Sequence, residues 1–186
     1  MNRAVFLDRD GTINIDKHYV YQVEDFEYLP GVVEALKLLQ SAEYLLIVIT
    51  NQSGIARGYF TEEDYKELEQ WIKSDLKSKQ VNLTASYYCP HLPEAVLPQY
   101  KKFCTCRKPK LGLFEKAINE YQIDIKKSYV IGDKLRDLAA CAWGCRGFLI
   151  GNSEKEDIIS AAKDGKYQKI SYCEDLKKCV YKILTI

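Results

Sequence analysis

Short apolar runs alternate with amphipathic helical patterns along the chain, and this alternation restricts the possible fold more than any other sequence feature. The apolar runs are residues 4–7, 45–49, 85–88, 129–131 and 148–150. The helical patterns are residues 32–39, 61–76, 113–121, 135–143, 158–162 and 176–184. Strands separated by helices favour a parallel sheet with helices on both faces. We therefore predict a Rossmann-like α/β fold, which binds ligands at the carboxyl ends of its strands.

The composition fits a single globular domain over residues 1–186. The sequence is 47% hydrophobic and 28% charged, and 27 basic against 26 acidic residues leave a net charge of +1. That balance argues against disorder and, lacking a basic excess, against a dedicated nucleic-acid binder. No stretch of 18 apolar residues exists, and charges at Arg3 and Asp8 come before any signal-peptide core. We predict a cytoplasmic protein without a membrane partner.

Two aspartates directly follow the first apolar run. The sequence there reads FLDRDGT, with Asp8 and Asp10 two residues apart. At the end of an extended strand both side chains project to the same side, and they repel unless a cation or a proton lies between them. Mg²⁺ beside a phosphate would meet this need, with one carboxylate attacking phosphorus and the other transferring protons. The alternative is a strand end that turns at Gly11.

Three later segments could complete a phosphate site. Thr50 and the residues after it supply hydroxyl and amide donors at the end of the second run. Arg107 and Lys108 supply cations that could offset the charge of a transferred phosphoryl group. Asp133 follows the fourth run, and Asp137 comes one helical turn later. Each segment alone also fits an ordinary turn or helix start, but their order on successive strand ends favours one shared site.

With these four pieces in order, the chain resembles phosphatases of the haloacid dehalogenase superfamily from residue 3 to about residue 159. The resemblance implies Mg²⁺-dependent hydrolysis through an aspartyl phosphate on Asp8, with Asp10 as general acid and base. It implies that Thr50 and Lys108 stabilise the phosphoryl group. The Mg²⁺ ligands that it implies are the Asp8 side chain, the Asp10 backbone carbonyl and the Asp133 side chain.

The resemblance also implies which residues contact the substrate. These are Asn51, Gln52 and Ser53 after the second strand, Arg107 beside Lys108, and Lys134 beside Asp133. Asp137 is expected to orient Lys108 or a metal-bound water. Residues 54–58 are expected to form a flexible connection into the next helix.

A short flap is predicted between the first strand and the first helix. Residues 13–29 leave no room for an inserted cap domain, so the site is expected to be open to extended substrates. In the related phosphatases this segment contacts the sugar, which makes Asp16, His18 and Tyr19 candidate substrate residues. A solvent-exposed turn is the alternative.

Four metal-binding side chains lie in the longest stretch without a secondary-structure pattern. Cys89 and His91 are separated by one residue, as are Cys104 and Cys106. Four such ligands fill the tetrahedral shell of a structural Zn²⁺, so we predict a zinc loop over residues 89–106 that fixes the position of the adjacent Arg107. Buried thiols and a surface histidine are the alternative. The remaining cysteines of the seven lack this pairing and are expected to be ordinary thiols.

This Cys/His spacing resembles one branch of the superfamily, which contains the heptose bisphosphate phosphatases and histidinol-phosphatase domains. The branch implies a small phosphorylated sugar as the partner, and because no motif suggests more than a monomer, we expect a monomeric enzyme. It would remove the 7-phosphate of heptose 1,7-bisphosphate in nucleotide-activated heptose biosynthesis, while Arg107 binds the 1-phosphate. Hydrolysis of histidinol phosphate or another small phosphomonoester is the alternative activity. A binding domain without turnover is the alternative class.

Overall fold

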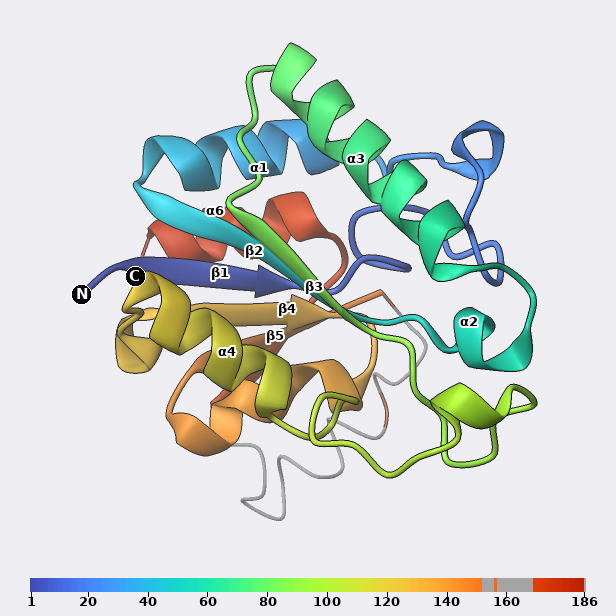
Figure 1. Ribbon diagram of the computed structural model, residues 1–186. Coiled ribbons are helices and arrows are strands. Elements are labelled where there is room, and N and C mark those ends of the chain that lie inside the picture. Colours follow the sequence, from blue (N-terminus) through green and yellow to red (C-terminus); the bar gives the residue numbers. More distant parts are fainter. Residues whose placement is uncertain (152–155, 157–168, 186) are drawn as a thin grey trace.

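The structure is a computed structural model that describes residues 1–151, 156 and 169–185. Its strands are β1 (Arg3–Leu7), β2 (Tyr44–Asn51), β3 (Ala85–Cys89), β4 (Tyr129–Gly132), β5 (Arg146–Ile150) and β6 (Ile170–Cys173). They form a 6-stranded sheet in the order β3-β2-β1-β4-β5-β6, with every neighbouring pair parallel (Figure 1). The predicted parallel α/β fold is confirmed, and β6 is a strand that the sequence pattern missed.

Helices cover both faces of this sheet. The helices α1 (Val32–Ser41), α3 (Glu62–Ser78) and α6 (Leu176–Leu184) pack on one face, and α4 (Gly112–Tyr121) and the 3-10 helix η4 (Leu135–Trp143) pack on the other (Figure 1). Alternate residues of β1 serve the two cores: Val5 and Leu7 face α1 and α6, whereas Ala4 and Phe6 face α4 and η4. Burial on both faces explains why the strands are continuous apolar runs.

Most of the predicted helices are present in the described residues. Thr61 and Asp64 form a capping box at the start of α3, and Gly144, with φ of 100°, ends η4. The connection predicted at residues 54–58 is instead largely helical, because α2 (Ser53–Arg57) is ordered by the packing of Ile55 in a small aromatic cluster. The predicted helix at 135–143 is wound as the tighter 3-10 form and is interrupted at Leu138.

Shorter elements complete the described part of the chain. They are the 3-10 turns η1 (Val23–Asp25), η2 (Pro98–Tyr100) and η3 (Ile125–Lys127). The helix predicted at residues 158–162 lies outside the described residues, and the single domain over 1–186 stays a prediction. Within the described ranges, no helix is both long and apolar enough to cross a bilayer.

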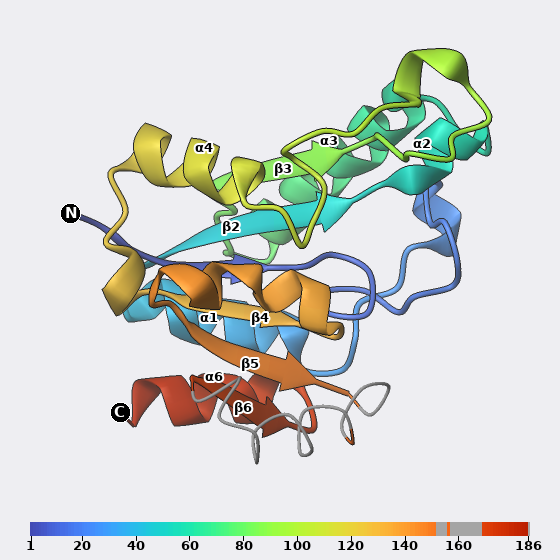
Figure 2. The same ribbon diagram turned by 90° about the horizontal axis from the view of Figure 1, so that it is seen from below.

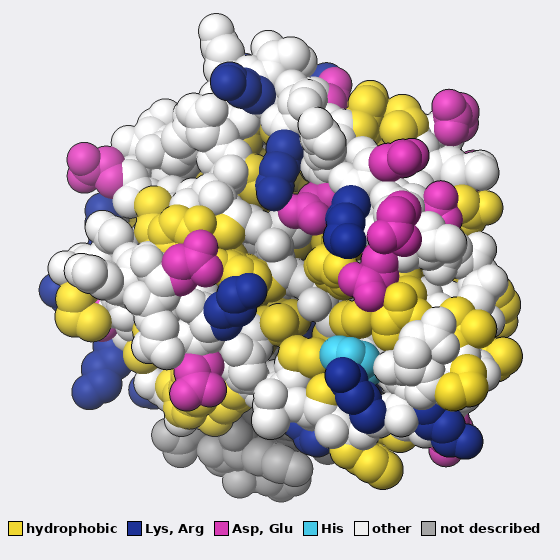
Figure 3. Space-filling model, viewed as in Figure 1, with side chains coloured by type: hydrophobic (Ala, Val, Ile, Leu, Met, Phe, Trp, Pro, Cys, Tyr) yellow, Lys and Arg dark blue, Asp and Glu magenta, His cyan; other side chains and the backbone are white. Residues whose placement is uncertain are grey.

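The strands of the sheet all point toward one end of the molecule (Figure 2). The flap after β1, α2 after β2, and the long segment between β3 and α4 gather at this end (Figure 2). Figure 3 shows acidic and basic side chains interspersed on the face of Figure 1, in keeping with the small net charge.

Candidate active site

A cavity of about 310 Å³ opens at the carboxyl ends of β1, β2 and β4. Its lining residues are Asp8, Asp10, Asp16, His18, Tyr19, Thr50, Asn51, Gln52, Ser53, Arg57, Arg107, Asp133, Lys134, Arg136 and Asp137. Every residue predicted for the phosphate site except Lys108 lines this cavity. Lys108 lies beneath its floor with a side chain that is 1% exposed. The topology therefore collects four distant sequence segments into one site.

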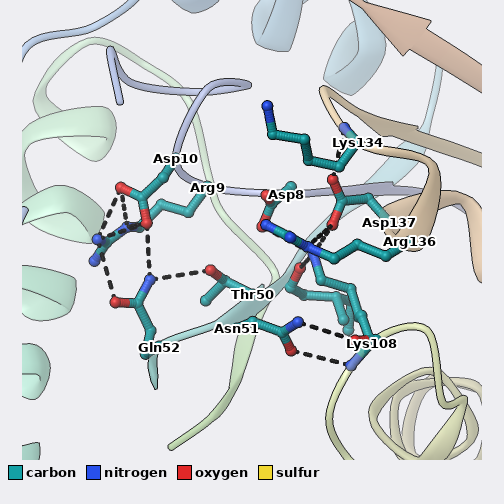
Figure 4. Close-up of polar contacts among 11 residues, drawn as sticks. Asp8, Arg9, Asp10, Thr50, Asn51, Gln52, Lys108, Lys134, Arg136 and Asp137 are labelled. Carbon is teal, nitrogen blue, oxygen red and sulfur yellow. Dashed lines mark hydrogen bonds and ion pairs between the residues drawn. The ribbon is translucent and has the colours of Figure 1, made fainter. Parts of the chain in front are cut away.

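The ammonium group of Lys108 connects two of the carboxylates. Lys108 Nζ lies 2.8 Å from Asp8 Oδ1 and 2.8 Å from Asp137 Oδ1, and it donates to the Ile49 carbonyl at 2.6 Å (Figure 4). Burial by itself would lower the pKa of Lys108, but Asp8 and Asp137 raise it above its ordinary value. Lys108 is therefore held as a cation beside Asp8, and Asp137 positions it.

The carboxylates nevertheless outnumber this one buried cation. Burial raises the pKa of Asp8 to about 6, with repulsion from Asp137 adding to the effect and Lys108 opposing it. Burial and repulsion from Asp8 also raise the pKa of Asp133. Oxygen atoms of Asp8, Asp133 and Asp137 all lie within 4.8 Å of one another. Lys134 Nζ lies 3.2 Å from Asp133 Oδ2 and offsets part of this charge. The three clustered carboxylates offer the oxygen donors that Mg²⁺ prefers.

Asp10 lines the same cavity, but its carboxylate does not form the expected pair with Asp8. It accepts hydrogen bonds from Arg9 at 2.9 Å, Asn14 at 3.0 Å and Gln52 at 2.9 Å (Figure 4). Asp8 instead has Asp133 and Asp137 as its carboxylate neighbours. Asp8 and Asp10 thus line one cavity, but because β1 ends at Leu7, hydrogen-bond partners rather than strand alternation fix the direction of the Asp10 side chain.

Arg9 is a site residue that sequence reasoning missed. Its guanidinium is buried, donates to the Val20 carbonyl at 2.6 Å and lies 5.7 Å from the centre of the Tyr65 ring. It therefore ties the flap to Asp10 and to α3. The position of Arg9 between two aspartates could have suggested a role in the site, but nothing in the sequence indicated that its side chain is buried.

Polar side chains at the end of β2 form hydrogen bonds that hold neighbouring site residues in place. The Asn51 amide pairs with the Lys108 backbone, accepting from its N–H at 3.0 Å and donating to its carbonyl at 3.1 Å (Figure 4). Gln52 donates to Thr50 Oγ1 at 3.0 Å as well as to Asp10. Asn51 and Gln52 were predicted to bind substrate. Their side-chain amides instead form hydrogen bonds with Lys108, Thr50 and Asp10, which indicates that they position these residues.

Gly11 allows the loop after β1 to pass against Asp133. Gly11 has φ of 81°, and a Cβ atom built there would lie 2.6 Å from Asp133 Oδ2. Gly151, directly after β5, has a similar φ of 75°, and no atom of the described residues lies within 4 Å of a Cβ built there. An alanine at either glycine would strain the left-handed backbone, but only an alanine at Gly11 would also clash with Asp133, a candidate metal ligand.

We expect Gly11→Ala to raise the dissociation constant of Mg²⁺ by at least about tenfold, because the new methyl group displaces the Asp133 carboxylate. Gly151→Ala should lose about 1–3 kcal/mol of stability through the same left-handed strain without weakening Mg²⁺ binding. Titration calorimetry of both variants with Mg²⁺ checks this. Equal affinity in the two variants would contradict the placement of Asp133.

The flap brings its predicted residues to the mouth of the cavity. His18 and Tyr19 both have φ of 61°, an uncommon left-handed conformation for residues other than glycine. The Asp16 carboxylate accepts a hydrogen bond from the His18 backbone N–H at 3.0 Å. The Tyr19 ring packs edge-on against the Tyr59 ring, with 4.7 Å between the ring centroids. These exposed side chains are available to a ligand in the cavity.

The Cys/His residues of the long loop converge on one point. The side chains of Cys89, His91, Cys104 and Cys106 place ligand atoms within 4.8 Å of one another. Cys89 Sγ lies 3.6 Å from Cys104 Sγ, and His91 Nδ1 lies 3.2 Å from Cys106 Sγ. Three sulfur donors and one nitrogen donor at these separations fit a tetrahedral Zn²⁺. Arg107 follows directly and donates to the His91 carbonyl at 3.4 Å.

Comparison with known proteins supplies the family. Residues 3–173 match a family model described as Polynucleotide kinase 3 phosphatase. A D-glycero-beta-D-manno-heptose-1,7-bisphosphate 7-phosphatase from Photorhabdus laumondii is 43% identical over 177 residues, which cover 95% of this chain and 94% of that protein. The chain belongs to the heptose bisphosphate phosphatase family. A crystal structure described as a putative had-like phosphatase from Mesorhizobium loti is 32% identical and covers 81% of this chain, which confirms the resemblance to the haloacid dehalogenase superfamily.

Other members agree in sequence and in structure. The enzyme of the same name from Haemophilus ducreyi is 52% identical over 139 residues, covering 74% of this chain and 76% of its own. A crystal structure described as D,D-heptose 1.7-bisphosphate phosphatase from B. bronchiseptica complexed with magnesium and phosphate superposes with a TM-score of 0.82. It is 31% identical and covers 98% of both chains. Heptose bisphosphate phosphatases thus share this fold over nearly the full length.

Proposed function

We propose that this chain hydrolyses the 7-phosphate of D-glycero-β-D-manno-heptose 1,7-bisphosphate in nucleotide-activated heptose biosynthesis. The observation that carries the proposal is the buried Asp8–Lys108–Asp137 network at the base of a cavity lined by phosphate-binding groups. Its position at the carboxyl ends of parallel strands suits ligand binding. Membership of the heptose bisphosphate phosphatase family supports the choice of substrate.

In the first step, a carboxylate oxygen of Asp8 attacks phosphorus and the bond to the sugar oxygen breaks. Asp10 gives a proton to that oxygen. Lys108 and Thr50 stabilise the charge of the transferred group, and Gln52 and Asn51 hold this machinery in place. In the second step, water attacks the aspartyl phosphate while Asp10 accepts its proton, which releases phosphate and restores Asp8.

Two metal ions belong to the proposal. Asp8, Asp133 and the Asp10 backbone carbonyl would hold Mg²⁺, which neutralises charge on phosphoryl oxygens when bound. Cys89, His91, Cys104 and Cys106 would hold a structural Zn²⁺ that keeps Arg107 at the cavity. Asp137 is assigned to Lys108 rather than to the metal, because its two oxygens already contact Lys108 Nζ and the Lys134 N–H.

The remaining assignments concern the substrate and the state of the protein. Arg107 would bind the 1-phosphate, and Ser53 and Lys134 would contact the transferred phosphate. Asp16, His18 and Tyr19 would contact the heptose from the flap. We further propose a cytoplasmic monomer with the small phosphorylated sugar as its partner and no nucleic acid or membrane partner.

A comparison of substrates tests the proposal. We expect kcat/KM for the β-anomer of heptose 1,7-bisphosphate to exceed that for histidinol phosphate by at least about 100-fold, because histidinol is cationic and arginine lines the cavity. The α-anomer should be measured beside it, with Mg²⁺ present throughout. If histidinol phosphate is hydrolysed faster than heptose 1,7-bisphosphate, the proposed substrate is wrong and histidinol phosphate takes its place.

A further inference from the structure

Three arginines from separate segments line the active-site cavity. Arg57 ends α2, Arg107 follows the Cys/His cluster, and Arg136 lies in the first turn of η4. Only Arg107 has a role in the proposed function. Arg57 lies in residues 54–58, which the sequence predicted to be a flexible connection. Arg136 lies between the predicted site residues Asp133 and Asp137. The fold brings the three guanidinium groups to one cavity.

Among the described residues, none of the three arginines has a carboxylate oxygen closer than 4.0 Å, although aspartates also line the cavity. The nearest carboxylate contact of Arg136 that the described residues show is from its Nε to Asp137 Oδ1 at 4.0 Å, and that oxygen already lies 2.8 Å from Lys108 Nζ. Arg107 donates to a neutral carbonyl, that of His91. Such a cluster is stabilised by an anion from outside.

The cluster lies nearer to solvent than the groups assigned to the transferred phosphate. Lys108 and Thr50 are 3% and 1% exposed, whereas the Arg136 side chain is 50% exposed and Arg57 is also exposed. The deep position suits the phosphate attacked by Asp8. A bisphosphate carries a second dianion that must remain nearer the mouth, where these arginines are. Guanidinium groups bind phosphate oxygens in a fork with good geometry.

We propose that Arg57 and Arg136 join Arg107 in a three-arginine subsite for the phosphate that is not transferred, and that this subsite makes the chain selective for bisphosphates. The inference rests on the proposed function, since it takes heptose 1,7-bisphosphate as the substrate. It adds two specificity residues that act on binding of the remaining phosphate rather than on the reacting atoms.

The test compares a bisphosphate with the corresponding monophosphate. For the parent enzyme, Arg57→Gln and Arg136→Gln, kcat/KM is measured with heptose 1,7-bisphosphate and with heptose 7-phosphate. We expect the preference for the bisphosphate to fall by about fivefold to tenfold in each variant, mainly through a higher KM for the bisphosphate. Arg136→Lys should restore part of it by keeping the charge. Arg146→Gln is the matched control, because Arg146 is exposed at the opposite end of the sheet.

Equal losses on both substrates, or an unchanged preference in both variants, would overturn the inference. Binding of heptose 1-phosphate, measured by titration calorimetry, separates this inference from the proposed function. If the parent enzyme does not hydrolyse heptose bisphosphate, the proposed function fails. The subsite still stands if Arg136→Gln weakens heptose 1-phosphate binding by about fivefold or more and Arg146→Gln does not. It falls if the two variants bind heptose 1-phosphate alike.

Discussion

Replacing Asp8 with Asn is expected to reduce phosphatase turnover by on the order of 10⁴-fold or more, because the amide cannot attack phosphorus. Hydrolysis of p-nitrophenyl phosphate with Mg²⁺ gives a simple first measurement, and heptose 1,7-bisphosphate gives the second. Acid-quenched parent enzyme should carry a phosphoryl group on the peptide that contains Asp8, and Asp8→Asn should not. Asp25→Asn, on an exposed turn of the flap, is the matched control and should retain activity.

The same substitution should leave the fold intact. Since the pKa of Asp8 is raised from its ordinary 3.8 to about 6 on folding, its ionised form costs stability at pH 7 when Mg²⁺ is absent. A neutral Asn avoids this cost, and its amide oxygen can still accept from Lys108 Nζ. We therefore expect the thermal midpoint in chelator not to fall. Full turnover by Asp8→Asn would refute the mechanism and favour a domain that binds phosphate without hydrolysing it by this route.

Loss of one of the proposed zinc ligands should produce the largest change in stability. We expect Cys106→Ser to lose its bound zinc and more than about 3 kcal/mol of unfolding free energy, because metal binding organises a loop without strands or long helices. Activity on heptose 1,7-bisphosphate should also fall, since Arg107 directly follows Cys106. Metal analysis of the purified protein, thermal denaturation and steady-state kinetics provide the three measurements.

Cys141→Ser is the control for this experiment. Cys141 is a half-buried free thiol outside the metal-binding group, so its replacement tests the general cost of removing a sulfur atom. We expect that variant to keep one zinc per chain and a normal KM. Purified parent protein without zinc, or the same loss of stability in both variants, would show that the cluster consists of ordinary thiols with a nearby histidine.

Much of the fold and several site positions could be read from local sequence. Apolar runs that are buried on both faces have a simple pattern, and their ends placed Asp8, Thr50 and Asp133 at one edge of the sheet. The close Cys/His spacing likewise predicted the cluster at residues 89–106. The strand β6 was missed because its sequence, ISYC, has no long apolar run.

Side-chain direction and long-range pairing could not be read in this way. The contact of Asn51 with the Lys108 backbone joins residues 57 positions apart, and the ion pair of Lys108 with Asp8 spans 100 positions. The burial of Arg9 and its bond to Asp10 depend on the flap and on α3, which lie elsewhere in the sequence. These contacts exist only once the sheet has brought the segments together.

The sequence by itself determined the parallel α/β architecture and the chemical groups at its strand ends, because hydrophobic periodicity and residue type are local properties. Tertiary structure alone decided that Arg9 and Gln52 hold the Asp10 carboxylate, that Asn51 pairs with the Lys108 backbone, and that Arg57 and Arg136 meet Arg107 at one cavity. The physical reason is that a charged side chain takes its direction and protonation from partners and burial, which come from distant parts of the chain.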